Sequence, residues 1–414
     1  MRIPQRVLHR TMTMSSGANA RAITVDPPAS AAIQRQKGEH WVTDRPKGFQ
    51  NPWPSAAPFV GAWEILKFVR QHSKLKADDP DVANFHNLVR QVTPTWGVDL
   101  PAHQVKATWL SHAAFLVEMP REVEAVDTKP EGVKGLTVLF DPAFSDRCSP
   151  TQLFGGNLRF SPPPARAADL PPVDIIAISH NHYDHCDLNT LREIYQRQHD
   201  RPPVLFVGLN GAANLRSTVG PHTEIIEMDW WEHRVVTVQG KGAVRITCTP
   251  AQHNCGRGLF DKDHSLWASW AVHSLNETGV PTGASVWHAG DTGYCSTKRE
   301  EEASHHIDPT EPVCPAFKEI GDRLGPFSLG MIPIGAYSPR WIMSSVHNAP
   351  IDAVRMFADT KCKKAIGMHW GTWRMAFDRI AEPAERLVKA REVVGLSEEQ
   401  FGLLALGETK GYDP

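Results

Sequence analysis

The chain has 414 residues and a formal net charge of −2, with 44 basic and 46 acidic side chains. This balance gives no overall positive field, so the composition argues against nucleic acid as a partner. The length allows two or three domains of average size or one large α/β domain. Because no run of about 18 apolar residues occurs, no transmembrane segment is expected.

The cysteines argue for a reducing compartment. There are seven, at scattered positions, and none forms a Cys-x-x-Cys pair. An odd number without close pairs does not suit a disulfide framework or a structural zinc knuckle. We therefore expect an intracellular protein.

The first 40 residues are predicted to form a flexible N-terminal arm ahead of one large domain that spans residues 41–410. The start of the arm is basic, because four arginines and no acidic residue precede Asp26. This composition is typical of a mitochondrial transit peptide. It equally fits an ordinary basic tail, so mitochondrial targeting is one of two expectations for the arm.

The earliest helical pattern runs from Gly61 to Gln71, where Trp63 and Leu66 fall on one side and Lys67 on another. Such a helix either packs on the protein core or touches lipid headgroups. The aromatic stretch Phe49–Trp53 is a second candidate for contact with lipid. Any contact of this kind would be peripheral to the membrane.

From residue 106 onwards, short runs of β-branched and aromatic residues predict a strand-rich region. The expected strands are Lys106–Met119, Gly135–Phe140, Val173–Ser179, Val204–Val207, Val235–Val238, Val244–Thr249, Trp267–Val272, Ser285–His288, Leu329–Ile334, Ala365–His369 and Phe401–Leu406. Helical patterns interrupt them at Asp187–Gln198, Asn210–Ser217, Ile351–Asp359 and Pro383–Val393. Strands with helices between them in both halves predict an α/β fold in which two sheets are sandwiched between helices.

The most informative stretch ends the strand predicted at Val173–Ser179. It reads Ser179-His180-Asn181-His182-Tyr183-Asp184-His185. A tight loop at a strand end can aim several imidazoles and a carboxylate at one point, and these ligands suit zinc, iron or manganese. The alternative is a chance cluster of histidines on a solvent loop, which does not account for the H-x-H-x-D-H order behind a buried strand.

Three later strands end in further metal-binding side chains, namely His253, Asp291 and His369. Taken singly, each histidine is more often a surface or core residue, and Asp291 would suit an Asx turn. Three such endings after the H-x-H-x-D-H loop are hard to explain separately. Since four ligands cannot complete a two-metal centre, we predict that these three residues complete it.

The order H-x-H-x-D-H, His, Asp, His resembles the metallo-β-lactamase superfamily, which implies an αββα sandwich with a binuclear metal site at the sheet edge. A closer resemblance, over about Gly48 to Gly407, is to the branch of N-acyl-phosphatidylethanolamine-hydrolysing phospholipases D. The motifs that carry it are Asn51-Pro52-Trp53, Trp109–Leu116, Asp141-Pro142, Ala289–Cys295 and Ile334–Trp341.

The resemblance implies that the ligands are divided between two zinc ions, with other divalent metals as alternatives. One ion would be held by His180, His182 and His253, the other by Asp184, His185 and His369, and Asp291 would bridge them. His112 and Asp141 occupy positions from which a hydrogen bond would fix the orientation of a ligand imidazole. The alternative for His112 is that it caps a turn.

The resemblance also implies a reaction, the hydrolysis of N-acyl phosphatidylethanolamine to an N-acylethanolamine and phosphatidic acid. The implied catalytic residues are Asp184, Asp291 and His347, the last near the substrate phosphate. Two metal ions would lower the pKa of a shared water and give a hydroxide that attacks phosphorus. The protein would meet its phospholipid substrate at a membrane interface, and a homodimer is one arrangement in which it would do so.

Other interpretations keep the metal site but assign it a different substrate or no catalytic activity. A lactonase or another phosphoester hydrolase would apply the same ligands to a different substrate. A nuclease is disfavoured because the chain is not basic. Outside the hydrolases, an inactive metal-binding scaffold would tolerate lost ligands, yet all seven are present. A redox di-iron protein of this fold would be expected to carry a flavin domain, and no such module is apparent.

Overall fold

The computed structural model describes residues 22–27, 35, 37–44, 47–56, 61–72, 79–120, 135–160, 162–258, 260–298 and 309–414. Residues 1–21, where most of the predicted transit peptide falls, lie outside these ranges. Among the described residues, no helix is both long and apolar enough to cross a membrane.

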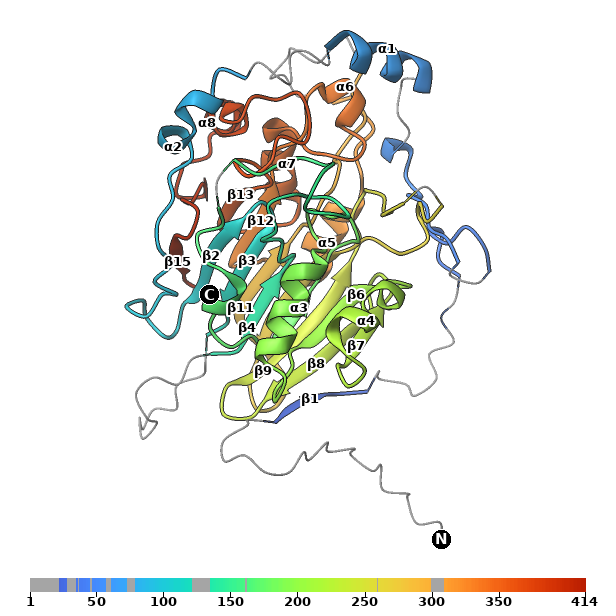
Figure 1. Ribbon diagram of the computed structural model, residues 1–414. Coiled ribbons are helices and arrows are strands. Elements are labelled where there is room, and N and C mark those ends of the chain that lie inside the picture. The colour runs from blue at the N-terminus through green and yellow to red at the C-terminus, as the bar shows by residue number, and fades with distance from the viewer. Residues whose placement is uncertain are drawn as a thin grey trace.

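Two sheets form the centre of the molecule (Figure 1). Within the described residues, the larger sheet has eight strands in the order β1 (Ile23–Val25), β8 (His233–Val238), β9 (Gly242–Thr249), β10 (Ser269–Leu275), β11 (Pro281–His288), β12 (Leu329–Pro333), β13 (Ala365–Met368) and β14 (Phe401–Gly402). The other has seven in the order β15 (Thr409–Tyr412), β2 (Val105–Ser111), β3 (Ala114–Glu118), β4 (Thr137–Phe140), β5 (Ile175–Ala177), β6 (Val204–Gly208) and β7 (Ile225–Met228). Both sheets are mixed, with parallel and antiparallel pairs.

Helices cover the outer faces of both sheets. The helices of the described residues are α1 (Ala62–His72), α2 (Phe85–Leu88), α3 (Leu188–Arg197), α4 (Arg216–Val219), α5 (Ala316–Leu324), α6 (Arg340–Met343), α7 (Pro350–Asp359) and α8 (Glu382–Val394). Of these, α3 and α4 lie on the seven-stranded sheet and α5, α7 and α8 on the eight-stranded one. By contrast, α1 and α6 lie beyond the ends of the strands (Figure 1). Leu191 of α3 packs in a cluster with strands of the seven-stranded sheet. Phe317 of α5 contacts Trp287 of β11, and Phe357 of α7 contacts Phe401 of β14 on the eight-stranded sheet. The αββα sandwich that the sequence predicted is thereby confirmed.

Strands of the seven-stranded sheet are buried on both faces. Ile175 and Ala177 of β5 belong to the core that the two sheets share, whereas Ile176 belongs to the cluster under α3. Because side chains alternate between the faces of a strand, a strand covered on both sides becomes a continuous apolar run. This is the pattern from which the strands were predicted.

The prediction of one long strand at Lys106–Met119 is wrong, because the segment forms a hairpin of β2 and β3. The turn falls at His112, whose φ of 44° lies in the left-handed region. Turn residues are usually polar and exposed, but His112 and its neighbours are buried. Only the two polar residues Ser111 and His112 mark the turn in the sequence, and neither is glycine or proline, the strongest turn signals.

The first strand, β1, falls inside the predicted N-terminal arm and pairs antiparallel with β8. The boundary between arm and domain at residue 40 stays a prediction.

The strands that carry the predicted ligands end at one edge of the sandwich. β11 and β13 both run parallel to β12, so Asp291 and His369, which follow them, reach the same edge. On the other sheet β4 and β5 are parallel, and Asp141 and the loop that starts at His180 follow them. His253 follows β9. The topology thus brings side chains from both sheets together.

Candidate metal centre

Asp291 lies at the centre of a cluster of imidazoles. Its Oδ1 is 2.8 Å from His369 Nε2, and its Oδ2 is 3.2 Å from His185 Nε2. The same Oδ2 lies 3.7 Å from His253 Nε2 and 4.0 Å from His180 Nε2. One carboxylate therefore faces four histidines that come from three separate strand ends.

A first group of ligand atoms consists of His180, His182 and His253, whose ring nitrogens all lie within 4.8 Å of one another. His182 Nδ1 is 2.8 Å from His180 Nε2 and 3.3 Å from His253 Nε2. Burial lowers the pKa of His180 and His253 well below the usual value, and it also lowers the pKa of His182. The three imidazoles are therefore neutral, which is the form that binds a metal.

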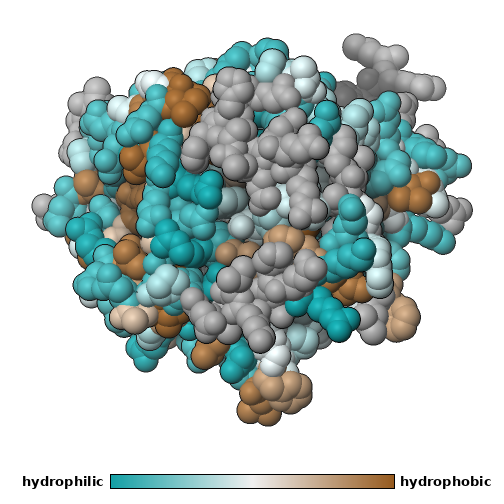
Figure 2. Space-filling model, turned by 90° about the horizontal axis from the view of Figure 1, so that it is seen from above, coloured by the Kyte–Doolittle hydropathy of each residue, from teal (hydrophilic) through white to brown (hydrophobic). Residues whose placement is uncertain are grey.

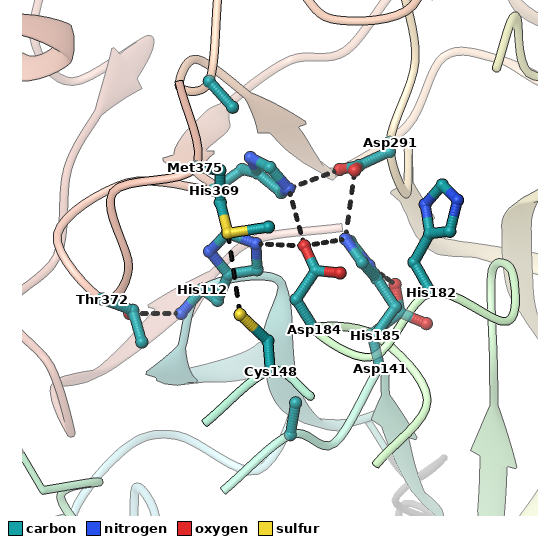
Figure 3. Close-up of polar contacts among 12 residues, drawn as sticks. His112, Asp141, Cys148, His182, Asp184, His185, Asp291, His369, Thr372 and Met375 are labelled. Atoms are coloured by element: carbon teal, nitrogen blue, oxygen red, sulfur yellow. Dashed lines mark hydrogen bonds and ion pairs between the residues drawn. The ribbon is translucent and has the colours of Figure 1, made fainter. Parts of the chain in front are cut away.

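A second group surrounds Asp184, whose Oδ2 lies 3.0 Å from His112 Nε2, 3.5 Å from His185 Nε2 and 3.7 Å from His369 Nε2. Figure 3 shows these side chains converging on Asp184 and Asp291. The structure thus brings together all seven residues that the sequence predicted as ligands, and it adds His112 to the second group.

Several buried atoms of the cluster have no hydrogen bond within the described residues. They include His185 Nε2, His369 Nε2 and Asp291 Oδ1, which face their neighbours as ion pairs but not in hydrogen-bond geometry. Buried polar atoms without partners are rare and cost about 1–3 kcal/mol each. A divalent cation bound by these nitrogen and oxygen atoms would satisfy them, so the donor set fits a metal site.

Charge is balanced inside this cluster. Burial by itself would raise the pKa of Asp184 and Asp291, but the neighbouring histidines, above all His185, hold both well below the usual value. Burial opposes protonation of His369, but Asp291 and Asp184 outweigh it and raise its pKa to about 9. The same two carboxylates raise the pKa of His185 well above the usual value. His369 and His185 therefore carry protons at the positions where a bound cation would lie.

Hydrogen bonds at Nδ1, the ring nitrogen that does not face Asp291, orient two of the imidazoles. Asp141 Oδ2 lies 2.7 Å from His185 Nδ1 and accepts a hydrogen bond of 2.6 Å from Ser179 Oγ. His253 Nδ1 lies 2.9 Å from the carbonyl of Val346. In both rings these contacts leave Nε2 directed at Asp291, as a ligand requires.

His112 combines both roles that the sequence left open. It forms the hairpin turn, and its backbone N–H donates a hydrogen bond of 2.8 Å to Thr372 Oγ1 while its carbonyl accepts one of 3.0 Å from His369 N. Its ring reaches Asp184, and burial with the nearby His369 lowers its pKa to about 3. A neutral His112 therefore touches both the carboxylate and the backbone of the centre.

His347 lies at the rim of the cluster, in the loop after α6. Its Nδ1 is 3.9 Å from Asp291 Oδ2 and makes no hydrogen bond to any described residue. Its ring centroid is 5.1 Å from that of His253 and 5.4 Å from that of His369. Burial lowers its pKa to about 4, so the ring is neutral at pH 7. The residue predicted to act on the phosphate is thus largely buried beside Asp291 and His253, and its ligand atom lies within 4.8 Å of theirs.

A glycine permits the close approach of the two loops. Gly290 has a φ of 61°, and a Cβ at this position would lie only 2.6 Å from Ser179 Cβ. The following residue is Asp291. Any larger side chain would push Asp291 away from the histidine-rich loop.

Sequence reasoning missed the residues that hold the ligands from outside. Ser179 Oγ contacts both Asp141 and His180 Nδ1. The Gln252 amide bridges Ser55 and the carbonyl of Ser345. Ser179 and Gln252 are neighbours of predicted ligands, and that adjacency is the only signal the sequence holds for them.

The chain is similar to several known proteins. The beta-lactamase superfamily domain matches residues 137–370. A Caenorhabditis elegans protein named N-acyl-phosphatidylethanolamine-hydrolyzing phospholipase D 1 is 30% identical over 95% of this chain and 98% of its own. A mitochondrial N-acyl-phosphatidylethanolamine-hydrolyzing phospholipase D of Saccharomyces cerevisiae is 29% identical over 80% of this chain and 68% of its own. Among solved structures, an isothiocyanate hydrolase from Delia radicum gut bacteria is 14% identical, with a TM-score of 0.48, over 74% of this chain and 99% of that one.

Proposed function

Because the chain belongs to the N-acyl-phosphatidylethanolamine-hydrolysing phospholipase D family within the β-lactamase superfamily, and is a metal-dependent hydrolase, we propose that its substrate is N-acyl phosphatidylethanolamine. Hydrolysis would give an N-acylethanolamine and phosphatidic acid. The observation that carries the proposal is the convergence of four imidazoles on Asp291. Such a centre suits attack by water on a phosphodiester.

We propose that the divalent metal this site would bind is zinc, with two ions per chain. His180, His182 and His253 would hold one, Asp184, His185 and His369 the other, and Asp291 would lie between them. A histidine-rich set with two carboxylates and no thiolate suits zinc, although other divalent ions share these preferences. When bound, two such ions supply Lewis acidity and lower the pKa of water toward neutrality.

The protein's own side chains would orient the attacking water and stabilise the charge on the phosphate. Asp184 and Asp291 are ionised and accept hydrogen bonds, so either can hold the attacking water by its proton. His347 is neutral and its Nδ1 is free to donate a hydrogen bond to a phosphate oxygen at the rim. Such a donor stabilises the charge that grows on phosphate oxygens in the transition state.

A triacyl substrate must be reached at a lipid surface. In α1, Trp63 is 66% and Leu66 57% exposed, with the ammonium group of Lys67 lying 5.6 Å from the centroid of the Trp63 ring. Phe68 of the same helix packs edge-on against Trp341 and Phe377. The helix therefore does both things that its sequence allowed, since one side packs on the protein and the other is free for lipid.

The second sequence candidate for lipid contact is wrong in part. Phe49 is only 2% exposed and belongs to the core, and the ring of Trp53 stacks on that of Trp230. Exposed apolar side chains occur instead at Leu153 and Phe154, which are 85% and 70% exposed. Viewed from the side on which α1 lies, Figure 2 shows separate hydrophobic patches among hydrophilic side chains. Peripheral docking through such patches suits a lipid hydrolase.

The place of the protein in the cell is part of the same proposal. The yeast relative is named as mitochondrial, and the arginine-rich start of this chain is typical of a transit peptide. Together they support a mitochondrial, peripheral membrane protein. A homodimer stays a prediction.

The test combines elemental analysis with a lipid assay on the purified protein. We expect two zinc ions per chain and release of N-acylethanolamine from mixed vesicles that contain N-acyl phosphatidylethanolamine. A chelator should abolish the release and added zinc restore it. Metal content near zero, or hydrolysis of lactones without hydrolysis of the phospholipid, would contradict the proposal.

A further inference from the structure

Residues 180–186, which we call the metal loop, are held from outside by the side chain of Arg257. Its Nη1 donates hydrogen bonds to the carbonyl oxygens of Asn181, at 2.8 Å, and Cys186, at 2.7 Å. These carbonyls lie near the two ends of the metal loop. The guanidinium also lies over the ring of Tyr183, with Cζ 3.9 Å from the ring centroid. One side chain therefore touches the start, the middle and the end of the loop.

Further contacts join the same two segments. The Tyr183 hydroxyl donates a hydrogen bond of 3.1 Å to the carbonyl of Arg257, and Gly256 N donates one of 2.8 Å to Asn181 Oδ1. The segment that carries Arg257 is itself fixed, since Asp261 accepts a hydrogen bond of 2.9 Å from Arg257 N. The backbone that carries the guanidinium is thus fixed by its own hydrogen bond to Asp261.

The backbone hydrogen bonds inside the metal loop tie its second half to His182. The N–H groups of His185 and Cys186 both donate to the carbonyl of His182, at 3.2 Å and 2.8 Å. The carbonyls of Asn181 and Cys186 take their hydrogen bonds from Arg257 instead. Loss of the guanidinium would leave both carbonyls unpaired at a half-buried site, and the loop would gain freedom to move.

We propose that Arg257 is a positioning residue for the metal centre, which fixes the backbone of the metal loop so that its four ligand side chains converge. These ligands are His180, His182, Asp184 and His185. By charge alone a guanidinium beside a cation site opposes metal binding, so its favourable effect comes from geometry. The inference rests on the proposed metal site and does not depend on the identity of the substrate.

The experiment measures zinc affinity by competition with a chromophoric chelator, using full-length protein stripped of metal. Arg257→Met keeps the unbranched stem of the side chain and removes the guanidinium with all its donors, so we expect zinc to bind about 10–100-fold more weakly, as is usual when a group supporting a metal ligand is lost. Both sites should weaken, because the metal loop contributes ligands to each. Arg257→Lys keeps donors near the carbonyls and should restore part of the affinity.

Arg323→Met is a matched control. The Arg323 guanidinium lies 4.4 Å from the centroid of the Trp231 ring and pairs with Glu319 on α5, so it makes similar contacts away from the metal loop. We expect this variant to bind zinc as the wild type does. Failure of the wild type to bind zinc would instead refute the proposed metal site itself.

Thermal unfolding separates positioning from a general effect on the fold. In Arg257→Met, the rise in melting temperature on adding zinc should shrink, while the melting temperature of the metal-free protein should change little. Wild-type zinc affinity in Arg257→Met would overturn the inference. So would tighter zinc binding, because charge repulsion would then be the main effect of Arg257.

Discussion

Asp291 is the side chain around which the other ligands are arranged, and its negative charge offsets the charge of the imidazoles that face it. Asp291→Asn keeps the size of the group and removes the charge. We expect metal content to fall and turnover to drop roughly a thousandfold or more, since paired ions need a shared anionic ligand. Metal analysis and the lipid assay on the same preparation would measure both.

The control for Asp291→Asn must be chosen with care. Asp187 stands just beyond the metal loop and carries a carboxylate of the same size. It is no neutral control, because it is buried and accepts hydrogen bonds from Ser145 N and Thr190 Oγ1. Asp200→Asn, at an exposed carboxylate, is the better control and should leave turnover unchanged.

Zinc affinity should rise with pH up to about 9. The neighbouring carboxylates raise the pKa of His369 to about 9, so below that pH the metal-free protein carries a proton where zinc would bind. Zinc must displace this proton, and its apparent affinity therefore falls as the pH falls. Calorimetric titrations in buffers of different ionisation enthalpy would count the protons released. Binding without proton release at pH 7 would contradict this assignment.

His347 should affect turnover more than metal binding. His347→Ala removes a neutral donor at the rim, and we expect a loss of about 10²–10³ in kcat, as for other donors to a developing negative charge. Zinc content should stay at the wild-type value, and His347→Gln, which keeps a donor, should recover part of the activity. If zinc were lost together with activity, His347 would be a ligand.

The ligands were visible in the sequence because each stands at the end of an apolar strand. His180, His253, Asp291 and His369 follow runs whose length and composition predict strands, and their order matches a known pattern. The side chains that hold them, such as Ser179, stand out only once distant segments have met. Their function depends on tertiary contacts, which local spacing does not encode.

At the scale of elements, α3 is tied to the sandwich through the residue that precedes it. Asp187 is the N-cap of α3, and its carboxylate accepts hydrogen bonds from Asn189 N and from Phe144 N in the loop after β4. Asp187→Ala should therefore lower the free energy of unfolding by about 1–2 kcal/mol or more. Denaturant titration would measure the loss, and an unchanged midpoint would show that the cap contributes nothing.

The sequence predicted the strands that form continuous apolar runs. It did not predict the strands and the helix whose apolar residues alternate with polar ones or are few. β5 and β13 are buried throughout, as is β11 from Ala284 to His288, and these buried segments match predicted runs. β7 and β15, which stand at sheet edges and are only partly buried, were missed, as was α5. A strand at the edge of a sheet keeps polar residues, so its sequence does not differ clearly from that of a loop.

At the scale of the whole molecule, activity should depend on presentation of the lipid. Replacing Trp63 and Lys67 on the exposed side of α1 should weaken co-sedimentation with anionic vesicles, since an apolar anchor and a charge worth about 1 kcal/mol are lost together. Hydrolysis of a short-chain soluble phosphodiester should be nearly unchanged. If both activities fell together, α1 would be structural, and if neither changed, the membrane face would lie elsewhere.

The contacts that build the sheets and the metal centre join segments that are far apart along the chain. Thr108 lies beside Thr409, 301 residues further along the chain, and the ligands themselves extend from His180 to His369. Pairings of such long range form late, because a long loop must close before they are made. A nascent chain on the ribosome therefore displays the histidines of residues 180–185 long before Asp291 and His369 have been synthesised. Native metal loading therefore requires that the chain as far as His369 has been made, and any ion taken up earlier would be held by an incomplete set of ligands.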